Sequence, residues 1–188
     1  MTAIKAFDVD KFIARPDPGL PIVLVFGPDA GLVRERVDAL VRASVDDPND
    51  PFALARIEGE ELAGNPARLV EEAHTVPLFG GRRAVLVKAG SRNIAAAVET
   101  VIASPSNECR VIIEAGDLRK TAPLRTLCEK AKVAAALPCY ADGMRAREMH
   151  RWRAAFHGEV DAVAALHRQL HLVQIGDLAD RRGDDGGR

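Results

Sequence analysis

The most constraining feature of this sequence is a regular alternation of short apolar runs with amphipathic stretches. The apolar runs are rich in β-branched residues, which is typical of strands buried on both faces. The stretches between them carry apolar residues at helical spacing. The pattern predicts strands at 21–26, 52–58, 83–88, 110–114 and 133–137, and helices at 32–43, 65–73, 94–103 and 123–132, after a weaker helical pattern at 5–14.

This alternation favours a parallel sheet, because a helix between two parallel strands returns the chain to the same end of the sheet. The chain has 188 residues, of which 47% are apolar, and this is enough for one domain with a real core and a short tail. We therefore predict an α/β domain with a three-layer parallel sheet, covered by helices on both faces, that ends near Tyr140.

Composition limits the partners that this chain can attract through its overall charge. The formal net charge is -1, so any contact with DNA has to come from a local patch or from partner proteins. No apolar run is long enough to span a bilayer, and the first residues lack the apolar region of a signal peptide. We expect a soluble, cytoplasmic protein with no membrane contact. The spacing of Cys109, Cys128 and Cys139 fits neither a redox pair nor a zinc ribbon, which predicts buried, reduced thiols.

An unusual apolar pair, Leu78-Phe79, stands between Pro77 and the glycine pair Gly80-Gly81. Proline and glycine mark a surface turn, where two large apolar side chains in a row are rarely found. An exposed apolar pair on a loop is a candidate docking wedge for another protein. The alternative is that both side chains pack beneath the helix predicted at 65–73, as they would in a generic α/β interaction domain.

The first predicted strand runs into a turn, Gly27-Pro28-Asp29-Ala30-Gly31, that invites comparison with a phosphate-binding loop. The lysine and the hydroxyl residue that such a loop needs are missing, because Leu32, Val33 and Arg34 follow Gly31. The third predicted strand ends in Lys88, where a metal-binding acidic residue would be needed. Gly27, Asp29 and Gly31 are therefore expected to serve the strand-to-helix turn. A small P-loop-type NTPase or kinase with an atypical site is the alternative.

Three segments in this order, PIVLVFGPDAGLVRERVDAL, EEAHTVPLFGGRRAVLVKAG and RVIIEAGDLRKTAPLRTLCEKAKVAAALPCY, resemble the delta subunit of the bacterial DNA polymerase III clamp loader. The resemblance covers about residues 5–144. It implies an AAA+-like (P-loop NTPase-like) domain with a degenerate phosphate loop, no catalytic residues and no cofactor. It also implies a noncatalytic subunit of the replicative DNA polymerase III complex, a nucleotidyltransferase, that acts in DNA replication.

In that family a Leu-Phe pair at this place inserts into an apolar pocket on the ring-shaped sliding clamp and favours the open ring. The resemblance gives this role to Leu78 and Phe79, with Pro77 leading into them. It places Arg82 and Arg83 where they could contact acidic clamp surface. The implied partners are the sliding clamp and the ATPase and delta-prime subunits of the clamp loader, with DNA touched only weakly or indirectly.

The sequence changes character after about residue 144. From residue 133 on there is no lysine but eight arginines, which is what a shifted reading frame in a GC-rich gene gives. We expect a clamp-binding domain at 1–142, a truncated or frame-shifted helical segment at 143–175 and a disordered tail at 176–188. His167 and His171 have helical ligand spacing but no third ligand, so no metal site is expected. Assembly with the ATPase subunits is doubtful if the family's collar domain is missing.

Overall fold

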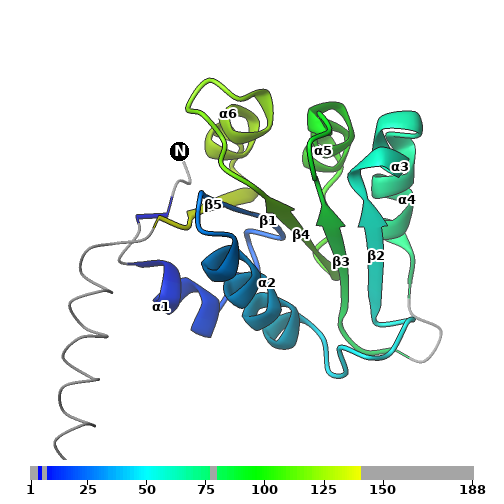
Figure 1. The fold of residues 1–188 in the computed structure, drawn as a ribbon. Helices are drawn as coiled ribbons and strands as arrows, with labels where there is room; N and C mark the ends of the chain where they lie inside the picture. Colours follow the sequence, from blue (N-terminus) through cyan, green and yellow to red (C-terminus); the bar gives the residue numbers. More distant parts are fainter. Residues whose placement is uncertain (1–3, 6–7, 77–79, 141–188) are drawn as a thin grey trace, which may run out of the picture. The chain divides into compact units, whose positions relative to one another are not determined.

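The computed structural model describes residues 4–5, 8–76 and 80–140, which contain one five-stranded sheet (Figure 1). Its strands are β1 (Ile22–Phe26), β2 (Leu54–Glu58), β3 (Arg83–Lys88), β4 (Cys109–Ala115) and β5 (Ala134–Pro138). They lie in the order β2-β3-β4-β1-β5, and each neighbouring pair is parallel. The predicted parallel sheet is confirmed, because each strand overlaps one of the apolar runs of the sequence.

Helices cover both faces of the sheet, which confirms the predicted three layers (Figure 1). One face packs against α1 (Val9–Ala14) and α2 (Ala30–Ser44). The other packs against α3 (Gly59–Gly64), α4 (Ala67–His74), α5 (Ala95–Ala103) and α6 (Pro123–Lys130). The chain order and the sheet order differ at β1, since the connection from β4 to β5 crosses over it.

The uninterrupted apolar sequence of β1 follows from its central place between β4 and β5. Ile22, Leu24 and Phe26 belong to the core beneath α3 to α6, whereas Val23 and Val25 belong to the core beneath α1 and α2. All five side chains are 0–1% exposed. Each of them stabilises the fold by about 1.5–3 kcal/mol through transfer from water.

The element boundaries differ from the predictions in three places. β2 begins at Leu54 rather than at residue 52, because the Asp50 side chain accepts a hydrogen bond from the Phe52 amide (2.8 Å) and holds a turn there. Helix α1 begins only at Val9. Helix α3 was not predicted at all: a reciprocal capping box between Glu58 and Glu61 starts it, and Leu62 is its only large buried residue, too few for a periodic pattern.

The three cysteines are buried and free, as the sequence predicts. Burial raises the pKa of Cys109 to about 11 and that of Cys128 to about 12. Both thiols are therefore protonated at neutral pH and are poor nucleophiles.

Within the described residues, no helix is long and apolar enough to cross a membrane. The helical segment predicted at 143–175 and the tail predicted at 176–188 lie outside them, so the proposed division of the chain remains a prediction.

Candidate functional site

The connection from α4 to β3 leaves the body of the domain at the end of α4. The helix stops at His74, the Thr75 backbone turns to an extended conformation, and the Thr75 hydroxyl donates to the Glu71 carbonyl (3.0 Å). Val76 follows with 70% of its surface exposed. The chain enters β3 through Gly80 (φ 69°) and Gly81 (φ 95°), conformations that residues with a side chain rarely adopt. Both described ends of this connection are thus at the surface.

The three residues at the centre of the predicted wedge, Pro77, Leu78 and Phe79, lie outside the described residues. Their role as clamp contacts remains a prediction. The structure describes the residues on either side of them, which begin and end the connection at one end of the sheet.

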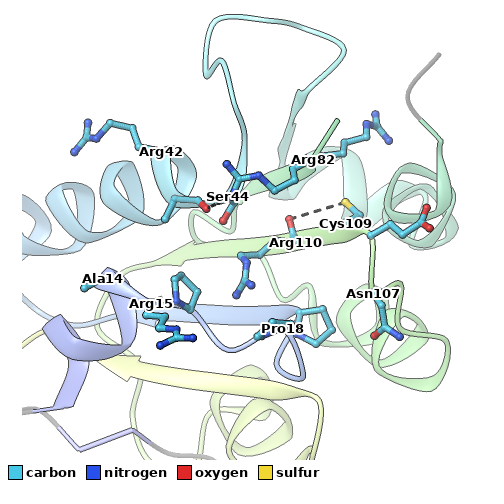
Figure 2. Close-up of a pocket in the computed structure, with 14 residues that line it drawn as sticks. Ala14, Arg15, Pro18, Arg42, Ser44, Arg82, Asn107, Cys109 and Arg110 are labelled. Atoms are coloured by element: carbon cyan, nitrogen blue, oxygen red, sulfur yellow. Dashed lines mark hydrogen bonds between the residues drawn. The ribbon is translucent and has the colours of Figure 1, made fainter. Parts of the chain in front are cut away.

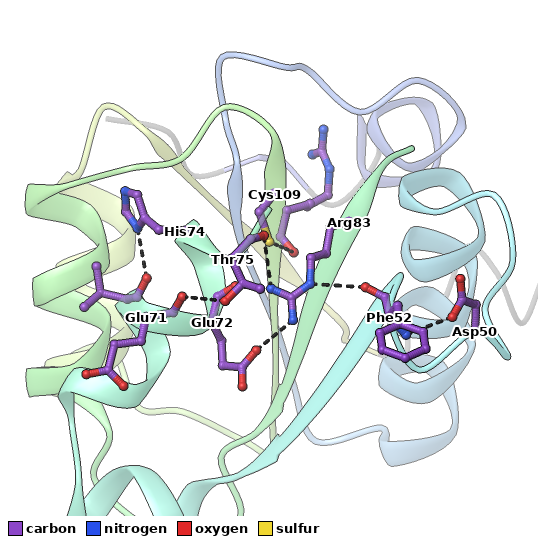
Figure 3. Close-up of polar contacts among 10 residues, drawn as sticks. Asp50, Phe52, Glu71, Glu72, His74, Thr75, Arg83 and Cys109 are labelled. Carbon is purple, nitrogen blue, oxygen red and sulfur yellow. Dashed lines mark hydrogen bonds and ion pairs between the residues drawn. The ribbon is translucent and has the colours of Figure 1, made fainter. Parts of the chain in front are cut away.

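Arg83, the first residue of β3, ties this connection to the body (Figure 3). Its side chain is 7% exposed and forms an ion pair with Glu72, with 2.7 Å between Nη2 and Oε2. Nη1 also donates to the carbonyls of Glu72 and, at 3.3 Å, of Thr75, while Nε donates to the carbonyl of Phe52 (3.3 Å). One guanidinium therefore holds the end of α4, the start of the connection and the turn before β2.

The two arginines predicted as clamp contacts, Arg82 and Arg83, differ in their contacts within the domain. Arg83 has its donors engaged inside the domain, which favours a positioning role over a direct contact with a partner. Arg82 is exposed and donates to Asp46 Oδ1 (2.8 Å) and to the Ala43 carbonyl (2.9 Å) at the end of α2. Its hydrogen bond and charge lower the pKa of the Asp46 carboxyl. Arg82 remains accessible to a partner.

Two exposed apolar side chains flank the Arg83 cluster. Phe52 is 61% exposed and Val76 is 70% exposed; with Tyr140 they are the exposed large apolar residues of the part that the structure describes. The Phe52 carbonyl and the carbonyl of Thr75, next to Val76, both accept hydrogen bonds from Arg83, so the two segments lie side by side (Figure 3). Sequence reasoning missed Phe52 because it placed this residue inside a strand. The Pro- and Asp-rich run at 46–51 was the available signal of a turn.

The degenerate phosphate loop begins where the end of β1 packs against the segments that follow β4 and β5. The Gly27 amide donates to the Gly116 carbonyl (3.2 Å), and the Cys139 amide donates to the Phe26 carbonyl (2.7 Å). A Cβ atom on Gly27 would lie 2.1 Å from the Cys139 carbonyl oxygen. Asp29 caps α2 by accepting from the Leu32 amide (3.0 Å). Gly31 lies in the first turn of that helix, and only the Asp29 side chain approaches its Cβ position.

Replacing Gly27 by alanine is expected to destabilise the domain by about 1–3 kcal/mol, since the backbone on both sides has to move apart. Gly31→Ala is the matched control. The nearest atom to its added Cβ is a side-chain oxygen at 3.4 Å, and its φ is not positive, so helix propensity favours alanine. Urea unfolding curves of both variants measure the difference. Equal stabilities would show that Gly27 is not needed for the packing of β1 on the segment after β5.

The strand order, the crossover and the loop between β1 and α2 define the class of this domain. It is an α/β domain of the P-loop NTPase type, similar to AAA+ domains, whose phosphate loop lacks the lysine and hydroxyl groups of an active site. The family model of the DNA polymerase III delta subunit matches residues 24–136. The chain belongs to this family.

A solved structure supports the fold. The Bacillus subtilis DNA clamp loader delta protein superposes with a TM-score of 0.56 at 23% identity, over 72% of this chain and 42% of that chain. A DNA polymerase III gamma subunit-related protein from Thermotoga maritima matches with a TM-score of 0.49 at 15% identity, over 74% of this chain and 47% of that chain. This chain thus spans less than half the length of either. A comparison with curated proteins gives no match.

Proposed function

We propose that this domain binds the sliding clamp of the replicative DNA polymerase through the α4–β3 connection and stabilises the open ring, as the delta component of a clamp loader. The observation that carries the proposal is the connection itself. It starts and ends at the surface, contains Leu78-Phe79 and is braced at its base by Arg83. Phe52 and Val76 extend the exposed apolar surface beside it.

The chemistry of this function is binding without catalysis. An apolar pair that fits the open ring better than the closed ring shifts the population toward the open ring by the difference of its two binding free energies. No bond is made or broken by this domain, so it needs no phosphate-binding lysine and no metal. Nucleotide hydrolysis would belong to the ATPase subunits of the loader, which are proposed partners together with the delta-prime subunit.

Bracing of the connection favours tight binding. A loop that is already held near its bound conformation loses less conformational entropy on binding, so more of the contact energy appears as affinity. The guanidinium of Arg83 fixes the start of the connection through the Thr75 carbonyl, and Gly80 and Gly81 let the chain turn sharply into β3.

The test is direct binding of the purified chain to a bacterial sliding clamp by calorimetry, combined with release of clamps preloaded on nicked circular DNA. We expect a Kd of about 1 µM or below and faster clamp release without nucleotide. Absence of both effects would contradict the proposal.

A nucleotide titration separates the alternative function, an atypical NTPase or kinase. Binding of ATP or GTP with a Kd of about 10 µM or tighter would favour that alternative, because the loop after β1 would then hold phosphate in spite of its missing lysine. We expect no heat of binding for either nucleotide under the conditions in which the clamp binds.

A further inference from the structure

A second feature at the same end of the sheet is a cavity of about 580 Å³ that lies between the ends of α1 and α2 and the starts of β3 and β4 (Figure 2). Positively charged residues outnumber negatively charged residues in its lining. Among the described residues of the lining, Glu108 is the only acidic one, whereas five arginines from four segments of the chain line the cavity: Arg15, Arg42, Arg82, Arg83 and Arg110.

Two of these five arginines already form ion pairs within the domain. Arg83 pairs with Glu72 and Arg82 pairs with Asp46, both at 2.8 Å or less. In the part of the chain that the structure describes, the Arg110 guanidinium donates to backbone carbonyls alone, those of Leu20 and Asp17, at 3.4 Å each. Arg15 and Arg42 are exposed, and within the described residues their side chains make no hydrogen bond or ion pair. Arg15, Arg42 and Arg110 thus line the cavity without an ion pair to any described carboxylate.

The Arg110 side chain is half-buried where it lines the cavity. Burial lowers the pKa of Arg110; the carboxylate of Asp17 opposes this effect and the charge of Arg82 adds to it. A carboxylate that entered the cavity would be attracted by Arg110, Arg15 and Arg42 together. Glu108 and the carbonyls at the end of α2 are the groups in the lining that oppose it.

We propose that this cavity binds aspartate or glutamate side chains of the sliding clamp, next to the apolar contact made by the α4–β3 connection. The inference rests on the proposed function and adds the chemistry of a second contact. Arg82 and Arg83 line the cavity and directly follow Gly80-Gly81, so a protein that engages the connection also covers the cavity. Guanidinium groups bind carboxylates in a planar, two-pronged geometry.

The shape of the site favours an acidic protein segment over duplex DNA. The arginines surround a concave space that three prolines also line, and 580 Å³ is the size of a pocket for a few side chains. A duplex is a rod that a row of cations on an open surface would follow. The whole chain, at a net charge of -1, adds no general attraction for DNA.

The experiment compares Arg15→Ala/Arg42→Ala with Arg34→Ala/Arg119→Ala. Both pairs remove two exposed arginines, and Arg34 lies on the same helix as Arg42 but away from the cavity. We expect the first variant to bind the clamp about 10-fold more weakly at 50 mM salt, with a smaller loss at 300 mM salt, because screening weakens exposed charge pairs. The second variant should bind like the unmodified chain, and both should keep its melting temperature.

Two probes separate this proposal from the proposed function: a fluorescent hexaglutamate peptide and a duplex oligonucleotide. Loss of peptide binding in Arg15→Ala/Arg42→Ala alone supports the acidic-segment site, even if the unmodified chain does not bind the clamp. Unchanged binding of both clamp and peptide in that variant overturns it. So does a loss confined to the oligonucleotide, which would make the cavity a nucleic-acid contact.

Discussion

Replacing Leu78 and Phe79 together by alanine is expected to weaken clamp binding by a factor of about 100 or more. Transfer of a leucine and a phenylalanine side chain out of water contributes about 1.5–3 kcal/mol each, and every 1.4 kcal/mol corresponds to a tenfold change in Kd. Residues of this kind, buried at the centre of an interface, form its hot spot. Calorimetric titration of the sliding clamp with the double variant measures the loss.

The melting temperature of the same variant decides between a docking wedge and a core pair. A wedge that is exposed in the free domain leaves the melting temperature within about 2 °C, since it contributes little to folding. A pair packed beneath α4 would instead cost about 2–5 kcal/mol per side chain and lower the melting temperature by many degrees. Lys120→Ala/Lys130→Ala is the control, because it truncates two exposed side chains, one before α6 and one at its last residue.

The sheet could be predicted from the sequence because its signal is local. Buried parallel strands need continuous apolar runs such as residues 22–26, and the shortness of this run, its β-branched residues and the flanking Pro21 and Gly27 distinguish it from a buried helix. The phosphate loop could likewise be judged degenerate from the residues after Gly31 alone. Helix α3 shows where prediction from apolar periodicity fails. Its six residues are held by a capping box and one buried leucine, so they carry no repeating apolar pattern.

The basis of the candidate site could not be predicted, because it depends on contacts between residues far apart in the chain. Arg83 was expected at the surface as a possible partner contact. It is instead buried, since Phe52, 31 positions earlier, and Glu72, 11 positions earlier, both supply acceptors for its guanidinium. The arginine-lined cavity has the same origin, because Arg15, Arg42 and Arg110 meet only after the parallel sheet has formed.

Replacing Arg83 by methionine is expected to destabilise the domain by about 2–4 kcal/mol and to lower its melting temperature by about 10 °C. Methionine keeps the apolar stem but removes the donor from the Glu72 carboxylate and from the carbonyls of Phe52 and Thr75, whereas the Glu72 carbonyl keeps the Thr75 amide as a donor. Arg82→Met is the matched control. It breaks an exposed ion pair with Asp46, which contributes about 0–1 kcal/mol.

Clamp binding by Arg83→Met, measured below its melting temperature, then distinguishes positioning from direct contact. Once the guanidinium no longer ties Thr75 to Phe52, the connection has to be ordered during binding, so we expect an affinity about 10-fold lower. Arg83→Lys keeps the charge but cannot reach all four acceptors. Its stability and its clamp affinity should therefore lie between those of Arg83→Met and those of the unmodified chain. A methionine variant that keeps its melting temperature and still loses the clamp would mean that Arg83 contacts the partner itself.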